Sequence, residues 1–374
     1  MSETDLDALL LLIAEHTTQM VDADRATIFI VDQDRGEIWS RVALGTGEIR
    51  VPIGRGLSGT VAQTGETINI PEAYADPRFN QETDRRTGYR TRSLITFPMR
   101  SRGDGRVIGV FQVLNKRGGP FTNEDEEMLG ALAASAAVAV ENAQLLAEQK
   151  RLWVSLMETL AVTIDARDQQ TAGHTKRVSR YAEVIGKQMG LDAKELERLR
   201  AGGLLHDYGK IAVPDGVLMK PGKLDEKEFE YMRAHAEKTG SFLKFITFPR
   251  DMREVPLIAA QHHERMDGKG YPDGVPAEKI HLGARIVAAA DVFDALTAPR
   301  YYKPAYSLEK TLEIMDGMSG NHLDPAVVRA VHDALPLLME TIEELKSSWP
   351  KVTDEASAAA GVSERDRPAG GSSS

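Results

Sequence analysis

The segment GLLHDYGKIAVP, residues 203–214, places His206 and Asp207 side by side at the end of an apolar run that is typical of a helix. A buried adjacent histidine and aspartate lower stability unless each side chain has a partner. Metal coordination supplies such a partner, because neutral imidazole and ionised carboxylate are both good ligands for divalent ions. The segment therefore predicts a metal site on a helical scaffold, in which the Asp207 carboxylate can bridge two ions.

Similar contexts recur farther along the chain. His262 and His263 precede Glu264 at another predicted helix end, and Asp291 lies in the apolar run ARIVAAADVFDAL, residues 284–296. Each dipeptide alone is weak evidence, but together they favour one shared site. The candidate ligands are His174, His206, Asp207, His235, His262, His263 and Asp291. The remaining histidines, assigned to the surface or to ordinary packing, are His16, His281, His322 and His332.

The composition limits the classes of protein to which the chain can belong. It has 374 residues, of which 42% are hydrophobic and 27% charged, as expected of a globular chain with two or three domains. The formal charge of -10 argues against partners such as polymeric nucleic acid or an anionic membrane. Since cysteine is absent, any metal site must use histidine, aspartate and glutamate.

The N-terminal sequence carries no targeting signal that we recognise. Its longest apolar run, Ala8 to Ala14, is too short to span a bilayer and follows acidic rather than basic residues. We therefore expect a cytoplasmic protein without a membrane partner.

The first third of the chain alternates between short strands and helices. Helical patterns cover residues 5–21 and 56–66. The strand patterns are ATIFIVDQ (26–33), EIWSRVAL (37–44), INIPEAY (68–74), SLITFPM (93–99) and RVIGVFQVLN (106–115). This order predicts an α+β domain with an antiparallel sheet and flanking helices.

A long uninterrupted helix is predicted next, because neither glycine nor proline occurs between Gly130 and Gly173. Apolar residues there follow steps of four and three, broken by Lys150: Leu132, Ala136, Ala139, Ala143, Leu146, Trp153, Met157, Leu160 and Ile164. The spacing favours a seam that pairs two protomers, so we expect a homodimer through this helix. The alternative is a helix packed on its own domain.

Residues beyond this helix are predicted to be almost entirely helical. Helical periodicity covers residues 176–190, 192–206, 225–246, 252–263, 283–297, 307–317 and 325–346. The last stretch, residues 352–374, is rich in alanine, serine, glycine and charge, and we expect a disordered tail.

Three motifs in the helical part carry a family resemblance. HDYGKIAVP (206–214), HHERMDGKGYP (262–272) and LGARIVAAADVFDALT (282–297) resemble motifs of the HD-GYP family of bacterial cyclic dinucleotide phosphodiesterases. Gly270-Tyr271-Pro272 is the tripeptide in the family's name. The resemblance implies an all-α HD-type metallohydrolase domain over residues 150–348, which begins with the end of the connecting helix.

The resemblance also implies roles for single residues. His174, His206 and Asp291 would hold one ion, and His235, His262 and His263 a second, with Asp207 bridging them; the two ions would be iron or manganese. Asp207 and Lys210 would serve catalysis, with Lys210 on the scissile phosphate. Substrate contacts are also implied for Arg300, Lys303, Tyr271, Gln169 and Gln170.

One position departs from the family pattern. Some family members hold a third metal through a glutamate four residues before the first histidine, where this chain has Gln170. An amide is a weaker ligand, so two ions are expected. Because amides both donate and accept hydrogen bonds, Gln169 and Gln170 also leave the base preference open.

The segment LNKRGGPFTNEDEEML, residues 114–129, is similar to the NKFDE motif of GAF domains that bind cyclic nucleotides. The matching residues are Asn115, Lys116, Phe121, Asp125 and Glu126. This resemblance implies a GAF sensor domain over residues 1–149, including the start of the connecting helix. Its ligand would be a cyclic nucleotide or another small molecule, and the alternative is a GAF domain used only for dimerisation.

We therefore predict an α+β GAF sensor domain joined by a long helix to an all-α HD-type domain. The predicted activity is metal-dependent hydrolysis of a cyclic dinucleotide, with cyclic di-GMP as the default substrate and cyclic GMP-AMP as the alternative. Two further hypotheses are a catalytically silent binding module and an HD phosphohydrolase that acts on nucleotide monophosphates or alarmones. The complete ligand set argues against the first, and the DGKGYP loop against the second.

Overall fold

The computed structural model describes residues 3–45, 47–167, 173–299 and 305–346. By contacts the chain divides into two units, Met1–Arg151 and Leu152–Ser374. Four candidate substrate residues, Gln169, Gln170, Arg300 and Lys303, lie outside the described residues, as does the predicted tail at 352–374.

The N-terminal unit is built on one six-stranded antiparallel sheet. Its strands are β1 (Ala23–Asp32), β2 (Glu37–Ala43), β3 (Arg50–Pro52), β4 (Ile68–Ile70), β5 (Leu94–Arg100) and β6 (Val107–Lys116). Their order in the sheet is β3-β2-β1-β6-β5-β4, with the long strands β1 and β6 paired at the centre. The predicted α+β order is confirmed, although the short strand β3 was not predicted and the strand predicted over 68–74 is limited to Ile68–Ile70.

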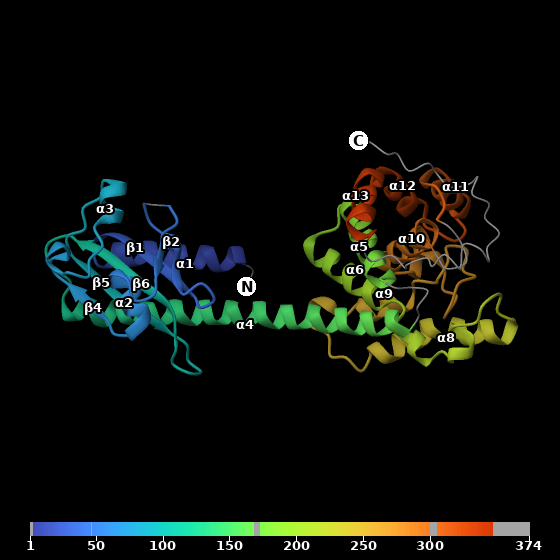
Figure 1. Cartoon of the computed structure of the whole chain (residues 1–374), viewed down its shortest axis with the longest axis horizontal. Coiled ribbons are helices and arrows are strands. Elements are labelled where there is room, and N and C mark those ends of the chain that lie inside the picture. The colour runs from blue at the N-terminus through green and yellow to red at the C-terminus, as the bar shows by residue number, and fades with distance from the viewer. Residues whose placement is uncertain (1–2, 46, 168–172, 300–304, 347–374) are drawn as a thin grey trace, which may run out of the picture. The chain divides into compact units, whose positions relative to one another are not determined.

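Helices cover both faces of this sheet (Figure 1). The helix α1 (Glu3–Met20) and the first part of α4 (Asn123–Arg167) pack on one face through a core that includes Leu10, Ile28 and Leu129. On the other face, α2 (Gly56–Thr64) packs with Phe29. The short helix α3 (Glu82–Thr87) belongs to the connection between β4 and β5. Successive residues of β1 thus pack into the cores on opposite faces of the sheet, because side chains alternate between the two faces along a strand.

The predicted long helix is confirmed as α4, which has 45 residues. The predicted two-protomer seam, however, is wrong at both ends of the helix. Ala136 and Ala139 are buried in the core of the N-terminal unit, and Met157 is buried in the C-terminal unit. Each end of α4 packs on its own unit, so these side chains are not free to meet a second copy.

The apolar character of α4 has a second consequence. An 18-residue window with a mean hydropathy of 1.4 is, by length and composition alone, apolar enough to cross a membrane, and 33% of that window is buried. A core helix of a globular domain passes the same test. Buried Ala133 and Val140 pack against the sheet in this way.

The regular elements in the described part of the C-terminal unit are helices, apart from one isolated bridge between Ser319 and Leu323. They are the end of α4, α5 (His174–Gln188), α6 (Ala193–Leu205), η3 (Tyr208–Ala212), α7 (Asp215–Leu218), α8 (Glu226–Leu243), η4 (Arg250–Met252), α9 (Val255–Ala260), η5 (Ala277–Lys279), α10 (Leu282–Thr297), α11 (Leu308–Met318), α12 (Pro325–Asp333) and α13 (Leu335–Leu345). α5 and α10 form the centre, where Tyr181 and Phe293 meet edge to face at 5.2 Å between ring centroids.

Several helix ends differ from the predicted ones; α8, for example, ends at Leu243 rather than at 246. The helix predicted over 325–346 breaks at Ala334 into α12 and α13, because Pro336 has no N–H to continue the ladder. α9 ends at Ala260, three residues before the predicted end, so His262 and His263 lie just beyond its last turn.

Candidate active site

All seven predicted metal ligands come together in the C-terminal unit. Three groups of them could each hold an ion, with ligand atoms within 4.8 Å of one another: His174, His206 and Asp291; His235, His262 and His263; and His206, Asp207 and His262. They come from the start of α5, the end of α6, the middle of α8, the turn after α9 and the middle of α10. Only folding of the whole unit brings these segments together.

The Asp207 carboxylate lies between two of these groups. Its Oδ2 is 3.3 Å from His206 Nε2 and 3.6 Å from His174 Nε2. Its Oδ1 is 3.3 Å from His235 Nε2 and 4.0 Å from His262 Nε2. One carboxylate therefore presents a different oxygen to each group, which is the arrangement that a bridging ligand needs.

Backbone carbonyls fix the orientation of three rings. The Nδ1 atom of His206 lies 2.7 Å from Gly203 O, that of His235 lies 2.5 Å from Met232 O, and that of His262 lies 2.6 Å from Ala259 O. Because a carbonyl can only accept, each Nδ1 carries the proton and each Nε2 keeps a lone pair directed at the centre. Such outer hydrogen bonds are the usual support of a metal-binding histidine.

The inward nitrogen atoms need a cation. His206 Nε2 is buried and makes no hydrogen bond within the described part of the chain. The Nε2 atoms of His235 and His262 lie 3.4 Å apart, so two lone pairs face each other. Burial lowers the pKa of His262 well below its usual value and that of His263 to about 3, which keeps both rings neutral and able to bind metal.

The carboxylates of the site stay ionised. Burial by itself would raise the pKa of Asp207, but Lys210 and the neighbouring histidines outweigh burial and hold it well below its ordinary range. Asp291 behaves in the same way: its hydrogen bond with His174 lowers its pKa against the effect of burial. The neutral rings of His262 and His263 and the ionised carboxylates of Asp207 and Asp291 therefore form a donor set that fits divalent ions.

A residue that the sequence analysis missed supports His174. Asp294 Oδ2 lies 2.8 Å from His174 Nδ1, and the same carboxylate accepts from the buried Arg177 at 2.6 Å. Burial lowers the pKa of His174, but hydrogen bonds to Asp291 and Asp294 outweigh it and raise that pKa to about 10. Asp294 follows Asp291 by three residues on an otherwise apolar helix, and this spacing on one helix face could have revealed it.

Lys210 lies beside the bridging carboxylate. Its Nζ is 2.7 Å from Asp207 Oδ2, and its side chain is 15% exposed. It belongs to the turn η3, which packs closely on α8, because a Cβ at Gly209 would lie 1.9 Å from His235 O. Gly209 thus allows the Lys210 turn to meet the helix that carries His235.

The Gly270-Tyr271-Pro272 segment folds against the same histidines. The Tyr271 ring lies 4.7 Å from that of His263 between centroids, and the exposed Arg233 lies 5.0 Å above the Tyr271 ring. A Cβ at Gly270 would come within 2.6 Å of the backbone around Glu264, so only glycine fits. Arg233, two residues before His235, is a second residue that the sequence analysis missed.

Glu264 holds the loop that contains this tripeptide. Its carboxylate accepts from the backbone N–H groups of Asp273, Gly274 and Val275 at 2.8–3.1 Å. Within the loop, the Asp267 carboxylate also accepts two hydrogen bonds from the Arg265 guanidinium. These bonds give the loop a defined path beside the histidines.

The predicted motif residues of the N-terminal unit lie at the junction of β6 and α4. Asn115 has a left-handed φ of 56° and binds the backbone of Arg92 and Ser93. Lys116 forms an ion pair with Asp125 in the first turn of α4. Phe121 is buried in the core, and Glu126 accepts from Asn69. These contacts tie the strand end to the helix.

Comparison with known proteins agrees with both halves of this description. Residues 5–140 match the family model described as GAF domain, and residues 157–327 match the one described as HD domain. The chain joins a GAF domain to an HD domain. The HD domain contains all seven predicted ligands, and the GAF domain contains the whole sheet.

Curated relatives of the HD domain include enzymes for two cyclic dinucleotides. The chain is 39% identical over 188 residues to a 3'3'-cGAMP-specific phosphodiesterase of Vibrio cholerae, covering 50% of this chain and 40% of that protein. It is 43% identical over 175 residues to a cyclic di-GMP phosphodiesterase response regulator of Xanthomonas campestris, covering 47% and 46%. The resemblance to the HD-GYP family is thus confirmed, although the chain spans less than half the length of either relative.

The GAF domain also has likenesses among solved structures. One is the GAF domain of a phosphoenolpyruvate-protein phosphotransferase from Coxiella burnetii, at 22% identity and a TM-score of 0.36, which covers 38% of this chain and 86% of that one.

Proposed function

We propose that the chain is a metal-dependent phosphodiesterase that opens a cyclic dinucleotide, with turnover in the HD domain and control by the GAF domain. The observation that carries this proposal is the position of Asp207, whose two oxygens face separate histidine groups. Two bridged ions are the usual machinery for in-line displacement at a phosphodiester. The curated relatives are phosphodiesterases of this substrate class.

In this proposal, one ion lies among His174, His206 and Asp291, and the other among His235, His262 and His263, with Asp207 shared. Iron and manganese fit a site of imidazoles and carboxylates without thiolate. When bound, such ions lower the pKa of a water molecule and shield the charge of the phosphate.

Residues of the chain would position the substrate. Lys210 Nζ, 2.7 Å from Asp207, is a cation next to the expected place of the scissile phosphate and would stabilise its oxygens. Arg233 and Tyr271 form a stacked pair beside His263, where a cation and an aromatic face would receive a second phosphate and a base. Arg300, Lys303, Gln169 and Gln170 remain proposed substrate contacts.

Cyclic di-GMP and cyclic GMP-AMP are both proposed as substrates, with cyclic di-GMP as the default. The named relatives include enzymes for each, at similar identity. The amide side chains of Gln169 and Gln170 fit either base, because an amide can donate and accept.

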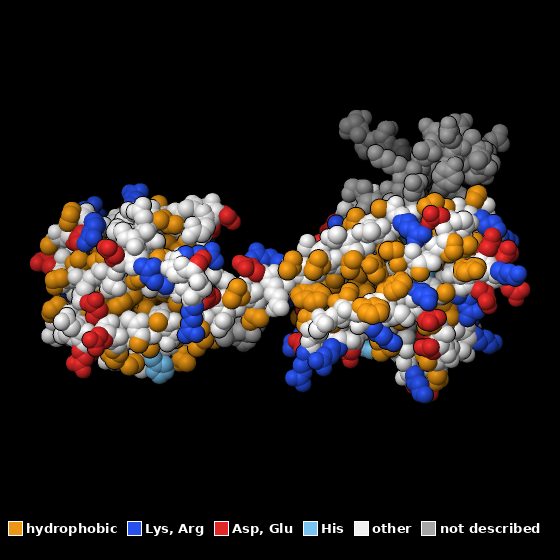
Figure 2. Space-filling model, turned by 90° about the horizontal axis from the view of Figure 1, so that it is seen from below, with side chains coloured by type: hydrophobic (Ala, Val, Ile, Leu, Met, Phe, Trp, Pro, Cys, Tyr) orange, Lys and Arg blue, Asp and Glu red, His pale blue; other side chains and the backbone are white. Residues whose placement is uncertain are grey.

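We further propose that the enzyme acts in the cytoplasm as a homodimer through exposed residues of α4. Leu145, Leu152 and Leu156 are each at least half exposed and follow steps of seven and four along the helix. Figure 2 shows further hydrophobic side chains gathered on one face of the C-terminal unit. A second copy would cover the exposed leucines in place of the seam predicted from the sequence.

The test is a turnover assay with cyclic di-GMP, cyclic GMP-AMP and cyclic di-AMP after reconstitution with manganese or ferrous iron. The proposal predicts a linear dinucleotide from at least one substrate and loss of turnover in the double variant His206→Ala, Asp207→Ala. The matched control His332→Ala changes a histidine far along the chain on α12 and should keep full activity. Full activity of the double variant, or binding without turnover by the wild type, would contradict the proposal.

A further inference from the structure

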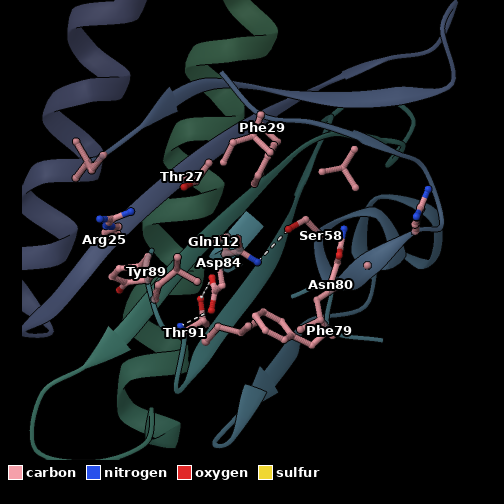
Figure 3. A pocket seen from close by; sticks show the side chains of 18 residues that line it. Arg25, Thr27, Phe29, Ser58, Phe79, Asn80, Asp84, Tyr89, Thr91 and Gln112 are labelled. Atoms are coloured by element: carbon pink, nitrogen blue, oxygen red, sulfur yellow. Dashed lines mark hydrogen bonds between the residues drawn. The ribbon is translucent and has the colours of Figure 1, made fainter. Parts of the chain in front are cut away.

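The GAF domain contains a partly open pocket between its sheet and α2 (Figure 3). The cavity has a volume of about 110 Å³. Its apolar wall includes Phe29, Leu94 and Leu114, and its polar wall includes Arg25, Thr27, Ser58 and Gln112. An apolar cavity of about 150 Å³ holds a molecule of the size of benzene. A cyclic nucleotide, with base, ribose and phosphate, is much larger and would extend outside this cavity, so the other alternative from the sequence, a smaller molecule, fits it better.

Arg25 gives the cavity a positive charge without a counter-ion. It lies on β1, two residues before Thr27, so both side chains project from the same face of the strand. Among the described residues its guanidinium forms no ion pair and instead lies 3.9 Å above the Tyr89 ring. Stacking on an aromatic face fixes the guanidinium plane while leaving its N–H donors available.

Thr27 supplies an unused hydrogen-bonding group on the same wall. The residue is only 4% exposed and lines the cavity, yet its hydroxyl makes no hydrogen bond to any described residue. Because the side chain lines the cavity, its hydroxyl is available to hydrogen-bond a molecule bound there. Figure 3 shows Arg25, Thr27 and Tyr89 on one side of the pocket and Ser58 and Asn80 on the other.

The opposite wall also offers donors. Ser58 Oγ accepts from Gln112 Nε2 at 2.9 Å, so its own proton is free to be donated elsewhere. Ser58 lies in the first turn of α2, whose cap residue Arg55 provides no side-chain hydrogen bond to the helix. The unpaired N–H groups of that turn add positive potential to the cavity.

The Asp84 carboxylate also lines the cavity, but its oxygens already accept hydrogen bonds from neighbouring residues. They accept from Thr91 N at 2.6 Å, Thr91 Oγ1 at 2.9 Å and Tyr74 Oη at 3.1 Å. The Asp84 oxygens are therefore engaged by Thr91 and Tyr74, and Asp84 forms no ion pair with Arg25.

We infer that the GAF cavity binds a small organic carboxylate, with its charged end at Arg25 and Thr27 and its short carbon chain against Phe29, Leu94 and Leu114. A guanidinium binds a carboxylate through two parallel hydrogen bonds, and the Thr27 hydroxyl adds a third donor. The apolar wall disfavours a bare inorganic anion, because such an anion has no carbon chain to pack against Phe29, Leu94 and Leu114. The inference deepens the sensor role proposed above, and rests on that role only for any effect on turnover.

The test is calorimetric titration of the full chain with acetate, propionate, butyrate and succinate. Each acid is compared with its uncharged amide, and cyclic AMP and cyclic GMP are included. At least one carboxylate should bind, and its amide and the cyclic nucleotides should not. Equal binding of acid and amide, binding of only a cyclic nucleotide, or no binding at all would overturn the inference.

Variants locate the site. Arg25→Gln should weaken carboxylate binding about ten-fold or more, since a charge-assisted bidentate pair is lost. Arg25→Lys should restore part of that loss. The control Arg35→Gln changes an exposed arginine in the turn between β1 and β2 and should bind as the wild type does. Unchanged binding by Arg25→Gln would refute the assignment.

A near-isosteric second variant guards against misfolding of the first. Thr27→Val removes one hydroxyl that has no protein partner, so it should fold and should weaken binding by a few-fold. Tighter or equal binding by Thr27→Val would contradict the role given to this hydroxyl.

The same samples separate this inference from the phosphodiesterase proposal. Carboxylate binding by a chain that turns over no cyclic dinucleotide would sustain the inference while the proposed function fails. Turnover by a chain that binds no carboxylate would support the proposed function and overturn the inference about the GAF cavity.

Discussion

The guanidinium of Arg167, the last residue of α4, donates to the backbone oxygen of Lys210 at 3.0 Å. It also donates to Val213 O at 2.8 Å. Two residues earlier, Asp165 accepts from the Thr175 hydroxyl at 3.1 Å, next to His174. The final turn of the connecting helix thus contacts both the turn that carries Lys210 and the start of the helix that carries His174.

Arg167→Ala should lower kcat about 10–100-fold, the usual range when an outer partner of a metal site is removed. The Lys210 turn would lose several hydrogen bonds at once, whereas the proposed metal ligands would be untouched. Steady-state kinetics and metal content measured on the same sample check this prediction. The control Asp215→Asn removes the exposed ion-pair partner of Arg167 and keeps the carbonyl contacts, so it should have little effect. Loss of metal together with activity would show that Arg167 has a general structural role instead.

Asp294→Asn should weaken binding of manganese about 10–100-fold, because the substitution removes the charge that orients His174. It should also lower thermal stability, since the buried ion pair between Arg177 and Asp294 is lost. Titration of the metal-free chain gives the affinity, and thermal unfolding gives the stability. If metal affinity stayed at the wild-type value while stability fell, Asp294 would support the fold but not the site.

The Lys116–Asp125 pair predicts a pH dependence of the stability of the GAF domain. Burial alone would raise the pKa of Asp125, but its bonds to Lys116 and Thr122 outweigh burial and lower it. A depressed folded-state pKa contributes stability above the unfolded value of about 3.9, and this contribution is lost as the pH falls through the folded-state pKa.

Asp125→Asn should therefore reduce the free energy of unfolding at pH 7 by about 1–3 kcal/mol. The difference from the wild type should shrink below about pH 4. Denaturant unfolding can be followed through Trp39 of the GAF domain, with Trp153 and Trp349 replaced by phenylalanine in both proteins. A difference that stayed constant from pH 7 to pH 3 would be inconsistent with an ionised Asp125.

Gly270→Ala should impair turnover, because the added Cβ would lie 2.4 Å from Arg265 N and 2.6 Å from His263 O. Displacement of this backbone would move Tyr271 away from His263 and raise KM. The control Gly216→Ala places a Cβ in open space and should leave the kinetics unchanged. Wild-type kinetics for Gly270→Ala would mean that the Tyr271 loop has no part in substrate binding.

The candidate site was largely predictable from the sequence, and the reason is local. Several ligands are polar residues within apolar segments, which can be recognised from the sequence alone: His206, Asp207, His262 and Asp291. Asp294 was missed although it lies in the same apolar run as Asp291. The grouping of the ligands into two sets bridged by Asp207 was implied by the family resemblance, whereas the residues alone could not give it because the ligands come from five separate segments.

Other features depend on contacts that no local pattern encodes. Arg167 reaches carbonyls more than forty residues away, and a surface arginine looks the same in sequence. The heptad spacing of α4 was real, but a period of seven does not say whether the partner is a second copy or the domain itself. Ala136 and Met157 face their own domains because the sheet and the C-terminal helices offer apolar surface there.

The metal content of the full chain tests the central claim most directly. After loading with manganese and removal of free metal, elemental analysis should give two ions per chain for the wild type. It should give about one for His263→Ala, which removes a ligand of one group only, and close to none for Asp207→Ala. A wild-type chain that retains no more manganese than Asp207→Ala would contradict the view that these side chains enclose two ions.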